Sequence, residues 1–511
     1  MKTRFTIPMA IIIYMFIAID ATAQTAEEIS EAWIQQNGHN ILAEYAELLR
    51  IPNHASDLEN IRKNADFLVN MYGKRGFEMQ LLEIDGAPPI VFGKRTAPGA
   101  ERTIALYVHY DGQPVDPEMW EHDPFDPVLY NDAMYRGGQP IPYPSTGEPI
   151  DDDWRIYARS ASDDKAPLIA LAAALDALED ANMDLTSNFI LFFDGEEESS
   201  SPHIRQYLDT YGHLLEEIDL WLMLDGAVYP TGDPRFSFGS RGITDMQLTV
   251  YGATRPLHSG HYGNWAPVPG QMLARLLTSM KAEDGTILID GFYDSIEPVS
   301  DFEREQIANA PNIDGMLKED LGLAFTEGEG ESLQERLLYP SLTIKGLASG
   351  SVGDRARNII PHTAIAELGI RMVKGNEPEA MMDLVEEHIR KEGWHIVRED
   401  PDHETRMQHP KIVKVVRGQD GYPASKTSME NPEVLKVIDG LKRATGGEGV
   451  FLPGTGASNR IYGMIFEDLG KPGVSVTMVN PDNNQHAENE NVRIGNIWLG
   501  TKMLSVMLTL E

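Results

Sequence analysis

Cysteine is absent from the 511 residues of the chain, and this absence removes several kinds of chemistry at once. Without thiols there can be no disulfide, no thiolate nucleophile and no cysteine-ligated zinc. Histidine and carboxylate side chains are the strong metal ligands that remain. The sequence also lacks the G-x-S-x-G, H-E-x-x-H, P-loop and G-x-G-x-x-G patterns, so several common hydrolase and nucleotide-binding signatures are missing.

Positive charge is scarce. The chain has 43 lysine and arginine residues against 79 aspartate and glutamate residues, which gives a formal net charge of −36. This balance argues against nucleic acid or anionic membranes as partners, because neutralising phosphates needs clustered lysine and arginine. The sequence therefore favours a small-molecule partner.

Long hydrophobic runs are also missing, apart from one near the N-terminus. Lys2 and Arg4 precede an apolar stretch from Ile7 to Ile19, and Ala21-Thr-Ala23 stands before Gln24. This order is typical of a cleaved signal peptide. A membrane anchor is the alternative, but the stretch contains Pro8 and is shorter than the roughly 20 residues that span a bilayer. We expect a signal peptide over 1–23 and an exported protein, periplasmic or secreted, without a membrane span.

The spacing of apolar residues predicts two domains. Residues 26–80 have helical spacing, and from about residue 100 short apolar runs alternate with helices, which is typical of a mainly parallel sheet with helices on both faces. An alternating strand at Met246–Val250 opens a smaller α+β, ferredoxin-like pattern, and the apolar run Val474–Val479 restores the first pattern. The predicted units are a catalytic domain at 24–240 and 416–511 and an inserted lid or dimerisation domain at 241–415.

Side chains that can bind metal follow the predicted parallel strands, at the points where the strands end. These residues are His109 and Asp111, then Glu196, Glu197 and Glu198, then Asp225, and, after a short loop, His486. Ser162–Pro167 adds two further carboxylates at a predicted helix start. Because ligand sites of such sheets lie at the carboxyl ends of the strands, we expect these segments to converge.

Each of these residues alone has an ordinary structural explanation, such as a turn or a solvated helix start. Together they would crowd unpaired carboxylates at one sheet edge, and such crowding is costly unless cations neutralise it. Mixed histidine and carboxylate ligands suit Zn²⁺, with Mn²⁺ or Co²⁺ as alternatives. The pattern predicts a hydrolase with two divalent metal ions.

The order and spacing of these residues resemble the M20 metallopeptidase family, in particular its carnosinase and nonspecific dipeptidase branch. The matching stretches are His109–Pro114, Ala161–Lys165, Gly195–Ser199, Asp225, Leu257–Gly260 with Gly263, Asn358–Pro361, Arg371 and His486. They extend over nearly all of the chain after the signal peptide.

The resemblance implies a role for each matching residue of the catalytic domain. His109 and Asp225 would bind one metal ion, Glu198 and His486 would bind the other, and Asp163 would bridge both. Glu197 would act as the general base. Asp111 would hold the ring of His109, and a cis peptide bond would follow Asp163. Glu196 falls outside the family pattern, so a shift of register among the three glutamates is the main alternative.

The resemblance also assigns residues to substrate. His258 and Asn358 of the inserted domain would stabilise the oxyanion, His258 reaching the active site of the partner in a homodimer, and Arg371 would bind the substrate carboxylate. Gly456 and Ser458 lie in a loop expected to contact substrate. Ser160, Ala166 and the loop Gly454–Ser458 depart from the family pattern. Because the loop is expected to contact substrate, the sequence does not determine which substrate is cleaved. The other histidines, including His122, His203 and His261, are interpreted as surface or packing residues.

The predicted function is cleavage of dipeptides or short peptides next to a free C-terminal carboxylate, as a dipeptidase or carboxypeptidase. An amidase or N-deacylase of N-acyl amino acids would use the same site and is the nearest alternative. A metal-stabilised binding protein without activity is disfavoured, because Glu197 is present. A two-metal phosphatase is disfavoured by the carboxylate-binding role of Arg371.

Overall fold

The computed structural model describes residues 24–328 and 330–510. The predicted signal peptide at 1–23 therefore lies outside the described residues. Within the described part of the chain, no helix is both long enough and apolar enough to cross a membrane.

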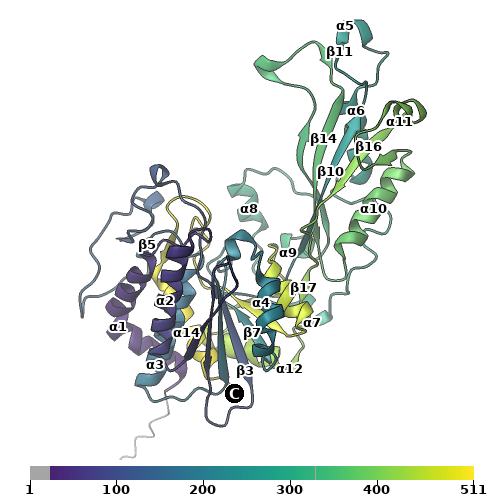
Figure 1. The fold of residues 1–511 in the computed structure, drawn as a ribbon. Coiled ribbons are helices and arrows are strands. Elements are labelled where there is room, and N and C mark those ends of the chain that lie inside the picture. Colours follow the sequence, from purple (N-terminus) through teal and green to yellow (C-terminus); the bar gives the residue numbers. More distant parts are fainter. Residues whose placement is uncertain (1–23, 329, 511) are drawn as a thin grey trace, which may run out of the picture.

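An eight-stranded sheet forms the larger part of the molecule (Figure 1). In spatial order its strands are β1 (Glu78–Leu82), β2 (Ile90–Arg95), β6 (Asn188–Asp194), β3 (Thr103–His109), β7 (Leu220–Met223), β19 (Gly473–Val476), β8 (Arg235–Ser237) and β18 (Val450–Leu452). The four central strands β6, β3, β7 and β19 run parallel, while antiparallel pairs occur toward both edges. The prediction of a mainly parallel sheet is confirmed.

Helices cover both faces of this sheet because the side chains of each central strand are apolar on both sides. Ile104, Leu106 and Val108 of β3 pack into one core, whereas Ala105 and Tyr107 pack into another. The first core includes residues of α1 (Ala26–Leu49), α2 (Leu58–Gly73), α3 (Lys165–Asp180), α12 (Pro432–Ala444) and α14 (Ile494–Leu508). The second includes residues of α4 (Ile204–Tyr211) and α13 (Arg460–Gly463).

A second sheet has five strands. It is formed by the stretch of chain that lies between the two stretches that build the large sheet. Its spatial order is β12 (Ser341–Ala348), β14 (Thr363–Met372), β10 (Gly242–Tyr251), β16 (Ile412–Arg417) and β15 (His395–Val397), with α6 (Pro269–Met280) and α10 (Pro378–Lys391) packed on one face. The order along the chain, β10-α6-β12-β14-α10-β16, is that of a ferredoxin-like unit. The expected boundary at residue 415 falls within β16, which pairs with β10 as far as Arg417.

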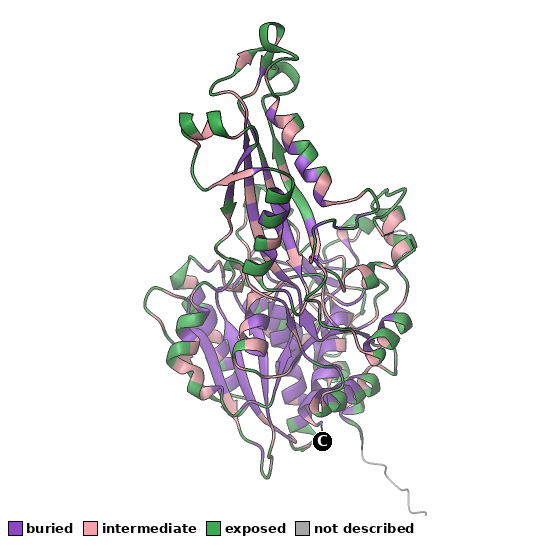
Figure 2. Ribbon diagram, turned by 90° about the vertical axis from the view of Figure 1, so that its right-hand side faces the viewer, coloured by how far each residue is buried: buried purple, intermediate pink, exposed green. Residues whose placement is uncertain are grey.

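Shorter elements complete the described chain. The small sheets pair β11 (Leu257–His258) with β13 (Ile359–Ile360), β9 (Gly239–Ser240) with β17 (Ser425–Lys426), and β20 (Asn491–Arg493) with β5 (Arg155–Tyr157) and β4 (Val128–Tyr130). The remaining α-helices are α5 (Ser259–Tyr262), α7 (Asp301–Asn309), α8 (Asp314–Asp320), α9 (Leu333–Arg336) and α11 (His403–Gln408). Buried residues concentrate in the large sheet and its helices, while the tip that carries β11 and α5 is exposed (Figure 2).

A buried carboxylate joins the helix and strands of the smaller unit. Glu386 of α10 accepts hydrogen bonds from Arg390, Arg398 and Arg417, each at 2.8 Å, and its side chain is 1% exposed. Burial by itself raises the pKa of Glu386, but the hydrogen bonds from Arg398 and Arg417 outweigh burial and lower the pKa to about 2. The charged form of this carboxylate therefore stabilises the unit.

Replacing Glu386 by Gln should lower the free energy of unfolding by about 1 to 3 kcal/mol at pH 7, because charged donors lose their partner. The folded pKa lies below the ordinary value of 4.5, so this contribution is present above pH 4.5 and is lost as the pH falls toward 2. Urea unfolding at pH 7 and at pH 3 measures it. The control Glu379→Gln removes an exposed partner of Arg417 and should cost less than about 0.5 kcal/mol. Equal effects of the two variants at pH 7 would contradict the prediction.

Candidate metal centre

The central strands and their loops bring five separate segments to one edge of the large sheet. His109 ends β3, Asp225 lies two residues after the end of β7, and Glu198 lies in the single turn after β6. Asp163 precedes α3, and His486 lies in the loop between β19 and β20. The convergence predicted from the strand ends is confirmed, since the parallel strands point their carboxyl ends the same way.

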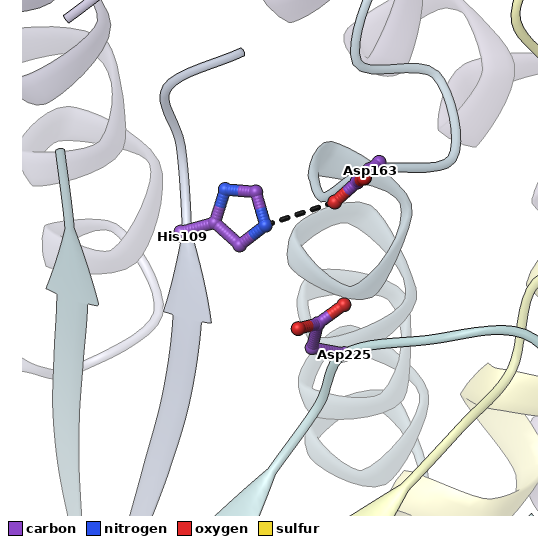
Figure 3. Close-up of side chains that lie close together, drawn as sticks. All are labelled: His109, Asp163 and Asp225. Carbon is purple, nitrogen blue, oxygen red and sulfur yellow. Dashed lines mark hydrogen bonds and ion pairs between the residues drawn. The ribbon is translucent and has the colours of Figure 1, made fainter. Parts of the chain in front are cut away.

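His109, Asp163 and Asp225 form one group that could hold a metal ion (Figure 3). Each of the three residues offers a ligand atom, and these atoms all lie within 4.8 Å of one another. Nε2 of His109 is 2.9 Å from Oδ1 of Asp163, while its Nδ1 lies 3.3 Å from Oδ1 of Asp111. Asp111 thus orients the ring so that Nε2 faces the group, a common arrangement behind metal-binding histidines.

Asp163, Glu198 and His486 form a second group with the same spacing. Nε2 of His486 lies 3.1 Å from Oδ2 of Asp163 and 3.3 Å from Oε2 of Glu198. Asp163 therefore presents one oxygen to each group, Oδ1 toward His109 and Oδ2 toward His486. The two groups share this carboxylate, and the peptide bond between Asp163 and Asp164 is cis, as the resemblance implies.

The electrostatics of the cluster favour bound cations. Burial and the neighbouring Asp163 raise the pKa of Glu198 to about 7 and that of Asp225 to about 6. Burial also opposes the charged form of Asp163, yet hydrogen bonds from His109 and His486 outweigh it and lower the pKa of Asp163. Carboxylates held this close repel one another unless positive charge lies between them. The two groups together offer histidine nitrogen and carboxylate oxygen atoms and no sulfur, and this set of ligand atoms fits Zn²⁺ or a similar divalent ion.

Contacts of the three glutamates support the register implied by the resemblance. Glu196 turns away from the cluster, where it accepts hydrogen bonds from the main-chain N–H of His203 at 2.9 Å and from the His203 ring at 2.8 Å. Asp111 accepts the main-chain N–H groups of Glu197 and Glu198 at 3.0 and 3.1 Å. Burial raises the pKa of Glu197. Glu198 therefore belongs to the second group and Glu197 stands next to it, whereas Glu196 and His203 support the loop.

Glu490 is a residue of this site that sequence reasoning missed. Its buried carboxylate accepts the main-chain N–H groups of Ser160, Ser162 and Asp163 at 2.8 to 2.9 Å, the Ser162 hydroxyl at 2.8 Å, and Nη1 of Arg159 at 2.8 Å. It lies four residues after His486, in the same loop. Glu490 thus connects the backbone around Asp163, which both groups share, to the loop that carries His486.

Three amide side chains of the site were also missed. Gln113 donates to Oε2 of Glu198 at 2.7 Å, Gln485 donates to Oδ2 of Asp163 at 3.2 Å, and Asn459 donates to Oε1 of Glu197 at 2.9 Å. Amide side chains do not ionise, and these three do not follow any recognisable motif spacing. The sequence therefore carries no signal that separates them from amides on the surface. They satisfy carboxylate oxygens that face the cluster.

The substrate residues predicted from the smaller unit fall into two sets. Nη1 of Arg371 donates to Oγ of Ser458, and Gly456 lies two residues earlier in the same loop, so the structure brings these three together. His258 and Asn358 are exposed and meet through the main chain, where the N–H of Ser259 donates to the carbonyl of Asn358. They lie with β11 and α5 at the far tip of the smaller unit, away from the large sheet (Figure 1). The structure does not bring them to the cluster of their own chain.

The geometry of the site defines a metallohydrolase, and the comparison with known families identifies it further. Residues 105–509 match the family model described as peptidase family M20/M25/M40. The chain belongs to this family and is a metallopeptidase. The resemblance drawn from the sequence motifs is confirmed.

Similar proteins agree with this assignment. The Cys-Gly metallodipeptidase dug1 of Schizosaccharomyces pombe is 28% identical over 357 residues, which cover 67% of this chain and 71% of the relative. The human Beta-Ala-His dipeptidase is 23% identical over 430 residues, covering 82% and 76%. Among solved structures, the M20 family metallo-carboxypeptidase Sso-CP2 of Sulfolobus solfataricus has a TM-score of 0.70 at 26% identity, covering 92% of this chain and 98% of that one.

The contacts of Glu490 lead to a testable expectation about metal binding. Glu490→Gln replaces an acceptor by an NH₂ group that faces main-chain donors, so the Asp163 backbone should shift. We expect metal affinity to fall by about 10- to 100-fold, the usual effect of losing a group that orients a ligand. Competition with a chromophoric chelator measures it. Glu488→Gln, an exposed change in the same loop, is the control. Unchanged affinity in Glu490→Gln would show that the ligand backbone does not depend on Glu490.

Proposed function

We propose that this chain is an exported dipeptidase or carboxypeptidase that uses two divalent metal ions, with zinc as the first candidate and manganese or cobalt as alternatives. The observation that carries the proposal is the shared carboxylate: Asp163 presents one oxygen to each of two ligand groups. The names of the relatives, a Cys-Gly metallodipeptidase and a Beta-Ala-His dipeptidase, support dipeptides as substrates. Residues 1–23 contain a basic start, an apolar run and small residues at the end, as signal peptides do, and this order supports export to the periplasm or the exterior.

The proposed reaction is hydrolysis of a peptide bond by water. His109, Asp163 and Asp225 would hold one metal ion, and Asp163, Glu198 and His486 the other. Bound metal ions polarise a substrate carbonyl and make water more acidic. Glu197 is the general base: it removes a proton from the attacking water and delivers it to the leaving amine.

Arg371 would bind the free carboxylate of the substrate. It donates to Ser458, and a planar guanidinium can hold a carboxylate through two parallel hydrogen bonds. Gly456 and Ser458 would form the adjoining wall. An amidase or N-deacylase acting on N-acyl amino acids would present the same carboxylate, so it remains the second candidate. Profiling of dipeptides and N-acyl amino acids with Zn²⁺, Mn²⁺ and Co²⁺ supplied in turn separates the two candidates.

We also propose that two chains pair through the smaller unit and that His258 and Asn358 act in the partner's active site. The position of β11 at the tip supports this, because a two-fold dimer repeats every contact between chains twice. The His258 ring accepts the N–H of Gly260 at 3.1 Å and is otherwise exposed. It could donate to a developing oxyanion, an interaction typically worth about 3 to 4 kcal/mol.

Glu197→Gln tests the assignment of the base. The variant should keep its bound metal but lose about 10² to 10⁴ in kcat, since an amide cannot accept the proton. Glu196→Gln, its matched control, breaks the contact with His203 and should retain most of the activity. Steady-state kinetics with metal analysis checks both. If Glu197→Gln were active and Glu196→Gln inactive, the general base would be Glu196, and the assignment of the glutamates would be wrong by one residue.

A heterodimer tests the role of His258 across the interface. We expect His258→Ala and Glu197→Ala to be inactive as separate proteins. A purified heterodimer with one change on each chain should regain about half of the wild-type activity, because one site then combines an intact Glu197 with an intact His258 from its partner. Two different affinity tags allow its isolation. A heterodimer as inactive as its parents would place His258 in the site of its own chain.

A further inference from the structure

Three arginines contact or adjoin the loop of residues 454–459, and we call Arg241, Arg371 and Arg460 the arginine cluster. The main-chain N–H of Arg241 donates to the carbonyl of Ala457 at 3.0 Å. Arg371 donates to the hydroxyl of Ser458, and Arg460 is the first residue of α13, directly after the loop. Three arginines from different parts of the chain thus meet at one short segment, Arg241 through its main chain, Arg371 through its side chain and Arg460 as the next residue in sequence.

Within the described residues, no member of the arginine cluster forms an ion pair. Arg241 donates from Nη2 to the carbonyl of Tyr339 at 2.7 Å, and Arg460 donates from Nη2 to the carbonyl of Asp420 at 3.1 Å. The buried Nε atoms of both side chains find no acceptor within the same residues. In a chain with 79 acidic residues this lack of carboxylate partners is informative, because acceptors are abundant.

The positive charges of the cluster act on one another. Arg241 is 8% exposed, and burial together with the nearby Arg371 lowers its pKa to about 10. Guanidinium groups that repel one another in a partly buried place are stabilised by an anion between them. The cluster therefore carries more positive charge than a single carboxylate would neutralise.

Arg371 and Arg460 lie on the same side of the smaller sheet. Arg371 is paired with Ile243 across β14 and β10, and Ile243 exchanges two main-chain hydrogen bonds of 3.0 Å with Tyr422. The guanidinium carbon of Arg460 lies 5.5 Å from the centre of the Tyr422 ring. Tyr422 thus lies near both arginines, and Ser458 precedes Arg460 by two residues.

The same loop also reaches the proposed base. Asn459, between Ser458 and Arg460, donates to Oε1 of Glu197 at 2.9 Å. The three consecutive residues Ala457, Ser458 and Asn459 therefore contact Arg241, Arg371 and Glu197 in turn. A substrate whose scissile bond lies at Glu197 would place the residue on its carboxyl side beside the arginine cluster.

We propose that the enzyme prefers peptides whose C-terminal residue carries a second carboxylate, namely C-terminal glutamate or aspartate. Arg371 binds the main-chain carboxylate, Arg460 binds the side-chain carboxylate, and the buried Arg241 adds positive charge behind them. The inference rests on the proposed peptidase function and names the substrate class of that same site.

The pair Ala-Glu and Ala-Gln tests this preference, because the two substrates differ in charge but hardly in shape. We expect kcat/KM of the wild type to be about 10- to 100-fold higher for Ala-Glu, the usual worth of a charge-assisted hydrogen bond. Arg460→Gln should reduce this ratio toward one. Arg443→Gln, an unpaired arginine in the last turn of α12, is the matched control and should keep the wild-type ratio.

The result on the wild type alone decides the inference, so it does not depend on how well the variants fold. Equal or faster hydrolysis of Ala-Gln would overturn the preference while leaving the peptidase function intact. Failure to hydrolyse either dipeptide, together with turnover of N-acetylalanine, would instead contradict the proposed function. A ratio that persists in Arg460→Gln, or that falls as far in Arg443→Gln as in Arg460→Gln, would overturn the role of Arg460.

Discussion

The carboxylate of Asp163 is the interaction on which the rest of the site depends. It meets His109 on one side and His486 on the other, so it joins two ligand groups whose histidines lie far apart in the sequence. The parallel strands bring these segments together at the same sheet edge. Holding several buried carboxylates at such short range is costly unless cations neutralise them, so the fold and the metal ions depend on each other.

Support for the shared carboxylate comes from residues that take no direct part in the proposed chemistry. Glu490 holds the backbone around Asp163, Asp111 holds both the His109 ring and the turn of Glu197, and Glu196 is fixed by His203. Each of these acids is buried or partly buried and has a defined set of donors. The site therefore separates carboxylates that face the cluster from carboxylates that organise its loops.

Much of this arrangement could be predicted because strand ends and apolar alternation are local signals. The central strands β3, β6 and β7 are continuous apolar runs, and each is followed at once by His109, by the glutamates or by Asp225. The boundary predicted at residue 415 falls inside β16, because the place of this strand is set by its pairing with β10, which is far away in the sequence. Glu490 could not be predicted, because its partners are mainly backbone groups more than 300 residues earlier.

Metal analysis of the wild type and of Asp163→Ala tests the shared carboxylate most directly. Purified protein, loaded with Zn²⁺ and passed through a desalting column, should contain about two ions per chain, and its hydrolytic activity should disappear on chelation. Asp163→Ala should retain fewer than one ion per chain, because both groups lose a ligand. Retention of two ions by Asp163→Ala, or full activity of the metal-free wild type, would contradict a centre built on this carboxylate.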